Sequence, residues 1–380
     1  MTQHVPLVDL GIQRDRVEDA VRKGFDEVMR NTSFVLGPAV TRFEDEYARY
    51  CEVAHCVGVA NGTDAVELAL RAAGITAGDE VILPANTFIA TAEAVVRAGA
   101  EVVLVDCTAD ALIDPVKVAQ AVTDRTRAVV GVDLYGQMAP YEALREVVGE
   151  SVTVVGDGAQ SQGARQNGRR AGSVADVTAT SFYPGKNLGA YGDGGAVLTA
   201  HDEIAAHLRI LRNHGEAAKY QHVALGFNSR LDSLQAVVLS AKLAWLDDWN
   251  AERRAAAAVY TELLAGSPVT TPRVTDGNEH IFHLYVVQVA ERDRVLPELH
   301  AHGVGAGVHY PNPIHLLPAF QYLGHRRGFF PVAEELASHI LSLPLFPGIT
   351  STQQHHVVDA LLDALGESPA VGEAVGERVG

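Results

Sequence analysis

Cysteine is scarce in this chain of 380 residues, which has only Cys51, Cys56 and Cys107. Three cysteines do not make a disulfide framework, and Cys51 and Cys56 lack the tight spacing of a zinc-binding pair. The segment from Met1 to Pro6 has no basic and then apolar signal pattern, and no apolar run reaches membrane-spanning length. We therefore expect inert, unpaired thiols, no membrane partner and a cytoplasmic protein.

Positive charge is also in short supply. Lys and Arg number 30 against 47 Asp and Glu, which gives a net charge of −17. A field of that sign repels nucleic acid, so nucleic acid is excluded as a general partner, and any anionic ligand needs a local basic or amide-rich pocket. Because hydrophobic residues make up 47% and charged residues 20%, we do not expect the bulk of the chain to be disordered. A length of 380 residues suits roughly two or three core units.

Short Val- and Ile-rich runs alternate with helical patterns through the first half of the chain. Continuous apolar strands of this kind are covered on both faces, which predicts an α/β fold with a mostly parallel sheet. Ligands of such sheets bind in the loops that follow the strands. The expected strands are residues 56–60, 80–83, 102–105, 128–132, 152–155, 177–182 and 195–198.

The composition changes at Gly266-Ser267-Pro268. We expect a large domain over residues 1–265, with an N-terminal helical segment and a long helical region at 232–265. A smaller C-terminal α+β domain would follow over residues 266–365, with strands at 281–289 and 304–310. Residues 366–380 lack periodicity and are expected to form a loose tail.

Lysine is restricted to five positions: Lys23, Lys117, Lys186, Lys219 and Lys242. Only Lys186 lies between a strand end and a glycine-rich turn, in Ser-Phe-Tyr-Pro-Gly-Lys-Asn-Leu-Gly at 181–189. A lysine so placed can reach over the strand-end crevice, where desolvation would make its amine a nucleophile. A loop lysine on the surface fits the same segment equally well.

Three other strand-end loops carry suitable chemistry. Asp157 follows a buried strand, where a carboxylate needs a partner such as a protonated pyridine nitrogen. Gly62 and Thr63 begin a helix, whose N-terminus favours a phosphate, although the same residues also suit an ordinary cap or turn. Phe88 could stack on a planar ring or belong to the core. Taken together with Lys186, these loops suit pyridoxal 5′-phosphate.

These motifs resemble the pyridoxal-phosphate-dependent nucleotide-sugar aminotransferases of the DegT type, a branch of fold type I. The resemblance extends from Val5 to about Leu365. It rests on the 181–189 segment with Gly-Asp-Gly-Gly at 192–195, on Gly-Thr-Asp-Ala at 62–65, on Asp-Gly-Ala-Gln at 157–160 and on Asn-Ser-Arg-Leu-Asp at 228–232. Each match is weak alone, whereas the ordered set is specific.

The resemblance implies a role for each matching residue. Lys186 would bind the cofactor covalently and act with Asp157, which would keep the pyridine nitrogen protonated. Gln160 would contact the phenolic oxygen of the ring. The phosphate would be bound by Gly62, Thr63 and Ser181, Phe88 would cover the ring, and Asn228 would reach the phosphate of a neighbouring subunit in a homodimer with shared active sites.

Two features concern the substrate. The sequence His-Tyr-Pro-Asn-Pro-Ile-His at 309–315 is similar to the substrate loop of sugar 3-aminotransferases that make amino-deoxyhexoses for antibiotics, which favours contacts from His309, Tyr310 and His315. Its loose spacing and lack of a nearby acid argue against a metal site. Lys219 and Arg230 are candidates for binding the diphosphate. The family often has His where this chain has Asp133, and the sequence does not reveal what replaces that imidazole.

The resemblance implies transfer of the amino group of L-glutamate, through pyridoxamine 5′-phosphate, to a keto group of a nucleotide-linked deoxysugar, with C3 favoured. Amination at C4 is one alternative. A sugar dehydratase on the same scaffold is another, but its known members replace the lysine or add an iron–sulfur centre. A non-catalytic regulator with this fold would not need Lys186, Asp157 and Gln160. A nicotinamide-dependent reductase is a further alternative, but this chain has no Gly-x-Gly-x-x-Gly motif after its first parallel strand.

Overall fold

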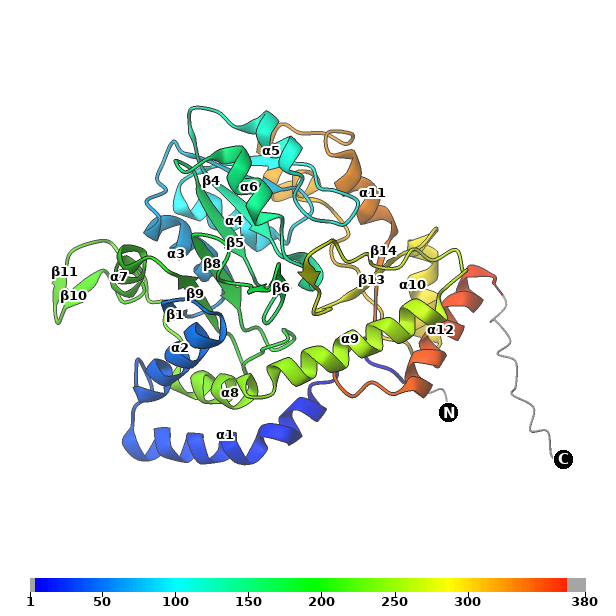
Figure 1. The fold of residues 1–380 in the computed structure, drawn as a ribbon, viewed down its shortest axis with the longest axis horizontal. Helices are drawn as coiled ribbons and strands as arrows, with labels where there is room; N and C mark the ends of the chain where they lie inside the picture. Colours follow the sequence, from blue (N-terminus) through cyan, green and yellow to red (C-terminus); the bar gives the residue numbers. More distant parts are fainter. Residues whose placement is uncertain (1–3, 368–380) are drawn as a thin grey trace.

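A seven-stranded sheet forms the centre of the computed structural model, which describes residues 4–367 (Figure 1). The strand order is β1-β9-β8-β5-β4-β2-β3. The strands are β1 (His55–Val59), β2 (Glu80–Pro84), β3 (Glu101–Val105), β4 (Thr126–Val132), β5 (Thr153–Asp157), β8 (Val177–Ser181) and β9 (Gly195–Thr199). Strands β3, β2, β4, β5 and β8 are parallel, and β9 runs antiparallel to both β8 and β1. The prediction of a mostly parallel sheet is therefore confirmed.

Helices cover both faces of the sheet, as alternate residues of β2 show. Val81 and Leu83 pack into the apolar cluster that contains α3 (Gly62–Ala72) and α4 (Ile89–Ala98), whereas Ile82 packs with α6 (Tyr141–Val148). Successive side chains of a strand point to opposite faces, so an unbroken apolar run is required. The remaining helices around the sheet are α2 (Pro38–Tyr50), α5 (Pro115–Ala121) and α7 (Asp202–Leu211).

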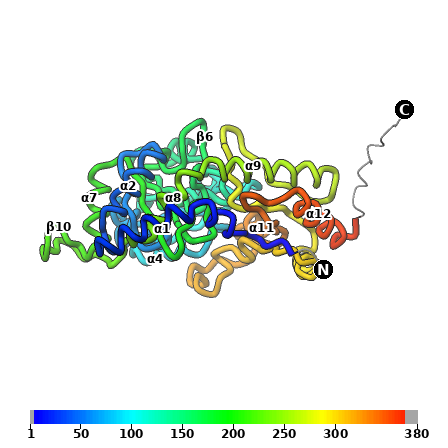
Figure 2. The backbone as a smooth tube through the Cα atoms, turned by 90° about the horizontal axis from the view of Figure 1, so that it is seen from below, coloured from blue at the N-terminus to red at the C-terminus, as the bar shows by residue number. Residues whose placement is uncertain are grey.

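Three helices lie below the sheet in Figure 1; two of them follow one another along the molecule, and the third packs beside the first of these (Figure 2). They are α1 (Gly11–Asn31), α8 (Ser233–Leu243) and α9 (Leu246–Leu263). The helical region expected over 232–265 is thus two helices, because the chain leaves the helix at Ala244 and Trp245. Figure 2 also shows the β10–β11 hairpin (Glu216–Ala218 and Gln221–His222) projecting from one end.

The C-terminal part contains the antiparallel pair β13 (Tyr285–Gln288) and β14 (Ile340–Leu343) with α10 (Arg292–Ala301), α11 (Pro331–His339) and α12 (Ser351–Leu365). Short elements are β6 (Arg165–Gln166), β7 (Arg169–Arg170), β12 (Asn278–Glu279) and the 3₁₀ turns at 134–136, 314–316 and 318–323. No helix within residues 4–367 is long and apolar enough to cross a membrane.

The C-terminal apolar cluster also includes the start of the chain and the end of α9. Val5 is fully buried there and pairs with Val304, and Tyr260 of α9 belongs to the same cluster. The division of the chain at residue 265 stays a prediction. The strand expected at 304–310 is absent from the described residues, where only Val304 and Gly307 form isolated bridges. Of the predicted tail, residues 368–380 lie outside the described range.

Candidate active site

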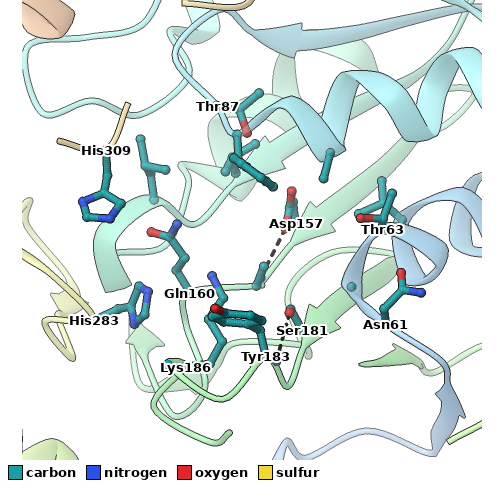
Figure 3. A pocket seen from close by; sticks show the side chains of 18 of the residues that line it. Asn61, Thr63, Thr87, Asp157, Gln160, Ser181, Tyr183, Lys186, His283 and His309 are labelled. Carbon is teal, nitrogen blue, oxygen red and sulfur yellow. Dashed lines mark hydrogen bonds between the residues drawn. The ribbon is translucent and has the colours of Figure 1, made fainter. Parts of the chain in front are cut away.

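A cavity of about 740 Å³ opens at the carboxyl ends of the central strands. Its walls come from the loops after β1, β2, β5 and β8 and from the C-terminal part (Figure 3). Side chains that are far apart in the sequence meet here because parallel strands end at one edge of the sheet. The predicted residues that line the cavity are Gly62, Thr63, Phe88, Asp157, Gln160, Ser181, Lys186, His309 and Tyr310.

Lys186 lies in the loop between β8 and β9. Main-chain bonds close this loop, with Lys186 N donating to Tyr183 O at 2.8 Å and Ala190 N donating to Phe182 O at 2.8 Å. The Nζ atom makes no hydrogen bond to any residue of the described chain. Burial lowers the pKa of Lys186 to about 8, against the opposing effect of Asp157. Of the two positions left open by the sequence, Lys186 therefore occupies the crevice.

Asp157 ends β5 and is buried. Its carboxylate accepts hydrogen bonds from Thr91 Oγ1 at 2.7 Å and from Ala159 N at 3.2 Å. Burial raises its pKa, while these two bonds and Lys186 act in the opposite direction. A carboxylate offers about four acceptor positions. Asp157 therefore has capacity for a further donor from the cavity.

The start of α3 forms the second side of the cavity. The side chain of Asn61 caps the helix by accepting from Asp64 N at 2.8 Å. A Cβ atom at Gly62 would lie 2.5 Å from Ser181 Cβ, so only glycine allows these two loops to approach so closely. The N–H groups of Gly62 and Thr63 make no hydrogen bond within the described chain. This is the usual composition of an anion site at a helix N-terminus.

Two aromatic side chains, Phe88 and Tyr310, form part of the cavity wall. Phe88 has half of its surface exposed and packs against Tyr310 with ring centroids 5.1 Å apart. Gln160 accepts from Tyr135 N at 2.7 Å and donates to Tyr310 OH at 3.1 Å, which fixes its amide. Because Phe88 lies over the cavity, the alternative that it belongs to the core does not apply.

Two histidines, His283 and His309, line one side of the cavity, and His283 is the nearer of the two to Lys186 in Figure 3. His309 Nδ1 lies 2.8 Å from Ser342 Oγ, and burial lowers its pKa, as does Lys186. His283 was not indicated by the sequence. It lies in an apolar stretch where a single histidine carries no signal, and only the fold brings it to the cavity.

Four predicted residues do not line this cavity. Lys219 lies on the projecting hairpin. Asn228 lies after the hairpin and pairs with Asn213, which lies before it. Arg230 donates to Asn213 Oδ1 at 2.9 Å. The structure of one chain therefore leaves these three side chains outside its own site.

His315, the fourth, requires a correction. The imidazole is buried, and its Nε2 atom lies 2.9 Å from the Glu334 carboxylate. Glu334 also accepts from Gly328 N at 2.7 Å and 2.8 Å. The prolines at 311 and 313 separate the two histidines of the motif so that His309 faces the cavity and His315 the interior. His315 therefore supports the 328–334 turn and does not contact a substrate in the cavity.

Asp133 is the residue that stands where the family often has histidine. Its carboxylate is almost fully buried and accepts from Tyr141 OH at 2.7 Å, Ala139 N at 2.8 Å and Ser161 Oγ at 2.7 Å. Burial raises its pKa to about 7, and those three bonds act against the rise. Asp133 does not line the cavity, and it ties the loop after β5 to the loop after β4.

The comparisons with known proteins agree along the length of the chain. The sequence profile of the DegT/DnrJ/EryC1/StrS aminotransferase family matches residues 15–362. The chain is 44% identical over 363 residues to a dTDP-3-amino-3,4,6-trideoxy-alpha-D-glucose transaminase of Streptomyces venezuelae, which covers 95% of this chain and 96% of the relative. It is also 44% identical over 365 residues to a pleiotropic regulatory protein of Geobacillus stearothermophilus, covering 95% and 98%.

A solved structure gives the same result for the fold. The crystal structure of DesV from S. venezuelae, in complex with a ketimine intermediate, superposes with a TM-score of 0.93 at 43% identity. The superposition covers 95% of this chain and 98% of DesV. The expected fold type is therefore confirmed.

Proposed function

The chain belongs to the DegT/DnrJ/EryC1/StrS aminotransferase family, and from this premise we propose that it transfers the amino group of L-glutamate to C3 of a nucleotide-linked keto-deoxysugar. The observation that carries the proposal is the meeting of three groups in one cavity. They are the amine of Lys186, the carboxylate of Asp157 and the start of α3 at Gly62. An amine, a carboxylate and an anion site suit a pyridine ring that bears an aldehyde and a phosphate.

The family implies pyridoxal 5′-phosphate, and the residues present fit it. Gly62, Thr63 and Ser181 offer N–H and hydroxyl donors for the phosphate, and Phe88 offers a flat face for the ring. The unused acceptor capacity of Asp157 suits a protonated ring nitrogen. When bound, the cofactor supplies an electron sink for the carbon that loses a proton.

Lys186 has the properties of the acid–base group of this reaction. Its Nζ atom is free of hydrogen bonds within the described chain, and burial lowers its pKa to about 8. A base is most effective when its pKa is close to the working pH. We propose that Nζ takes the proton from the substrate carbon on one side of the transferred nitrogen and gives it to the carbon on the other side of that nitrogen.

Asp157 would hold a proton on the ring nitrogen throughout the reaction. Two protein donors and the buried strand end fix its carboxylate. A buried charge pair of this kind is strong because water does not compete for either partner. Gln160, held by Tyr135 N and Tyr310, would contact the phenolic oxygen.

The substrate class rests on the relatives. The S. venezuelae relative is named for a 3-amino-trideoxyglucose linked to dTDP, and the cavity extends past the proposed ring site to Glu93 and Arg97 on α4. His309 and Tyr310 line the cavity, and we propose that they contact the sugar. We propose a keto-deoxysugar of an amino-sugar pathway for a secondary metabolite, with glutamate as donor.

We propose that the working enzyme is a homodimer. Lys219, Arg230 and Asn228 stay outside the cavity of their own chain, so a second chain would have to use them. The hairpin region that carries Lys219 also exposes Tyr220 and Leu225, of which 80% and 96% of the surface is accessible. Val223, which lies between them in the sequence, is exposed as well, and exposed apolar residues that gather in one place are typical of an interface. We also propose a cytoplasmic location. The three cysteines are buried and form no disulfide, which is usual for proteins in a reducing compartment.

The test is a product analysis. Purified protein with pyridoxal phosphate would be incubated with L-glutamate and a dTDP-linked 3-keto-6-deoxyhexose, and in parallel with the 4-keto isomer. The proposal predicts 2-oxoglutarate in equal amount to a 3-amino sugar, identified by mass spectrometry and NMR. Amination of the 4-keto isomer alone would move the reaction to C4, and loss of a hydroxyl without amination would establish the dehydratase. Cofactor binding without any product would favour the regulator.

A further inference from the structure

His283 is the one cavity histidine to which the proposed reaction assigns no role. Its segment between β12 and β13 is fixed to the 3₁₀ turn at 134–136, with Ile281 N donating to Gly136 O at 3.0 Å and Leu284 N to Tyr135 O at 3.2 Å. Only 8% of the His283 surface is exposed, and that part lines the cavity near Lys186 (Figure 3).

A chain of side-chain amides determines which ring nitrogen of His283 carries the hydrogen. Asn250 Nδ2 donates to the main-chain oxygen of Gln162 at 2.9 Å, and a carbonyl oxygen can only accept. Asn250 Oδ1 is therefore the acceptor for Asn187 Nδ2 at 2.8 Å, and the same nitrogen lies 3.3 Å from Ile281 O. Asn187 must then present its oxygen to His283.

The contact between Asn187 and His283 completes the assignment. Asn187 Oδ1 lies 3.1 Å from His283 Nδ1, which must carry the hydrogen and donate it. The neutral imidazole has one donor and one acceptor. Nε2 therefore holds a lone pair, and it has no hydrogen-bond partner among residues 4–367.

Burial, together with the surrounding positive charge, keeps the His283 ring neutral. Burial lowers the pKa of His283 well below its usual value, and Lys186, Arg253 and His309 lower it further. Since protonation would add a positive charge beside those groups, Nε2 stays an acceptor at neutral pH.

An acceptor in this position recognises a donor. The carboxylates of glutamate and the diphosphate of a nucleotide only accept hydrogen bonds. The amine of Lys186 and the amine that is transferred are both donors, but both are engaged in the reaction, so the donors that remain near the reacting carbon are the sugar hydroxyls. We infer that Nε2 of His283 takes the hydrogen of a sugar hydroxyl next to the carbon that receives the amine, and so selects and positions the keto-sugar. This inference rests on the proposed function.

Two substitutions separate the acceptor from the support that His283 gives to the loop. In His283→Asn the amide nitrogen lies where Nδ1 lay and keeps the bond to Asn187, but nothing replaces Nε2. In His283→Gln the longer side chain returns an acceptor to the cavity. Thermal melting of both variants checks folding.

The experiment follows two half-reactions by the absorbance of the bound cofactor. The first is driven by L-glutamate and the second by the dTDP-linked 3-keto-6-deoxyhexose. For His283→Asn we expect the sugar half-reaction to fall about tenfold to a hundredfold relative to the glutamate half-reaction, with His283→Gln recovering part of the loss. Calorimetry of the dTDP-amino-sugar product should show weaker binding to His283→Asn by a similar factor.

Three other outcomes overturn the inference in different ways. Equal slowing of both half-reactions by His283→Asn would assign the residue to support of the Lys186 loop. If His283→Asn changed neither half-reaction and left product binding unchanged, Nε2 would make no contact with the sugar. If the unsubstituted enzyme reacted with glutamate but with neither keto-sugar, the proposed function would fail first, and the inference with it.

Discussion

Two buried aspartates on neighbouring strands show how the same residue type serves two purposes. Asp157 and Asp133 follow paired strands, and Asp133 N donates to Asp157 O at 3.0 Å. Burial raises the pKa of both. Asp133 accepts three hydrogen bonds, two of them from Tyr141 and Ser161, and faces the interior. Asp157 accepts two bonds and faces the cavity.

Two lysines repeat this contrast. Burial lowers the pKa of Lys186 and of Lys242 to about 8. Lys242 donates to Gly189 O at 2.6 Å and lies over the ring of Tyr191, whereas the ammonium of Lys186 has no hydrogen-bond partner in residues 4–367. A perturbed pKa alone therefore does not identify a functional group. Unused hydrogen-bonding capacity that faces a cavity is the better criterion.

The sharpest test of the contrast replaces each lysine by methionine. Lys186→Met removes the attachment and the acid–base group together, so we expect amino transfer to fall by at least about a thousandfold. Lys242→Met removes a second buried ammonium with a lowered pKa but should change the transfer rate by no more than about threefold, with some loss of stability from the unpaired Gly189 oxygen. Turnover with glutamate measures both. Equal losses of the transfer rate in the two variants would contradict the claim that facing the cavity, and not burial alone, gives Lys186 its role.

The aspartates give a second comparison. Asp157→Asn removes the charge that would face the ring nitrogen, and we expect cofactor binding about a hundredfold weaker, because one partner of a buried charge pair is lost. Asp133→Asn keeps oxygen and nitrogen atoms near Tyr141 and Ser161 and should leave the affinity within about threefold. Fluorescence titration of apoprotein with pyridoxal phosphate measures both constants. A larger loss in Asp133→Asn would reverse the assignment.

The pH dependence of cofactor capture sharpens the argument for Lys186. Only the neutral amine reacts with an aldehyde, and the pKa of Lys186 is lowered to about 8. The capture rate should rise about tenfold per pH unit below pH 8 and level off above it. Stopped-flow absorbance records the rate, with a simple alkylamine in the same buffers as the control. A rate that keeps rising to pH 10 would describe an ordinary exposed lysine.

The last prediction concerns stability and not activity. Burial raises the pKa of Asp133 to about 7 in the folded state, above the unfolded value of about 4. The folded protein therefore binds more protons between these values, and this contribution to stability is present below pH 4 and is lost as the pH rises towards 7. In this range the free energy of unfolding should fall by up to about 1.4 kcal/mol per pH unit because of Asp133, and Asp133→Asn should abolish that part of the pH dependence. Urea unfolding at pH 5, 6 and 7 compares the two proteins, and parallel curves would contradict the shift.

Local patterns were sufficient for the strand-end residues. The Val- and Ile-rich runs predicted the parallel sheet, and the rule that ligands bind after such strands placed Lys186, Asp157 and Phe88 at one cavity. These predictions need only the order of strands and loops. The roles of the residues stay predictions until the cofactor is bound.

Other features depend on contacts that no local pattern encodes. His315 shares a motif with His309, but the direction of its side chain is set by Glu334 nineteen residues later. The strand expected at 304–310 finds no continuous partner, because Val304 pairs with Val5 from the other end of the chain. The position of His283 in the cavity could not be predicted, because it depends on a contact with Asn187, which is distant in the sequence.

The most direct test of the central claim is an absorption spectrum of the protein with pyridoxal phosphate, recorded before and after addition of L-glutamate. If the amine of Lys186 and the carboxylate of Asp157 form an amino-transfer site, the visible band of the lysine-bound cofactor should collapse to the near-ultraviolet band of pyridoxamine phosphate, with release of 2-oxoglutarate. A band that forms and ignores glutamate, or the absence of any band, would contradict it.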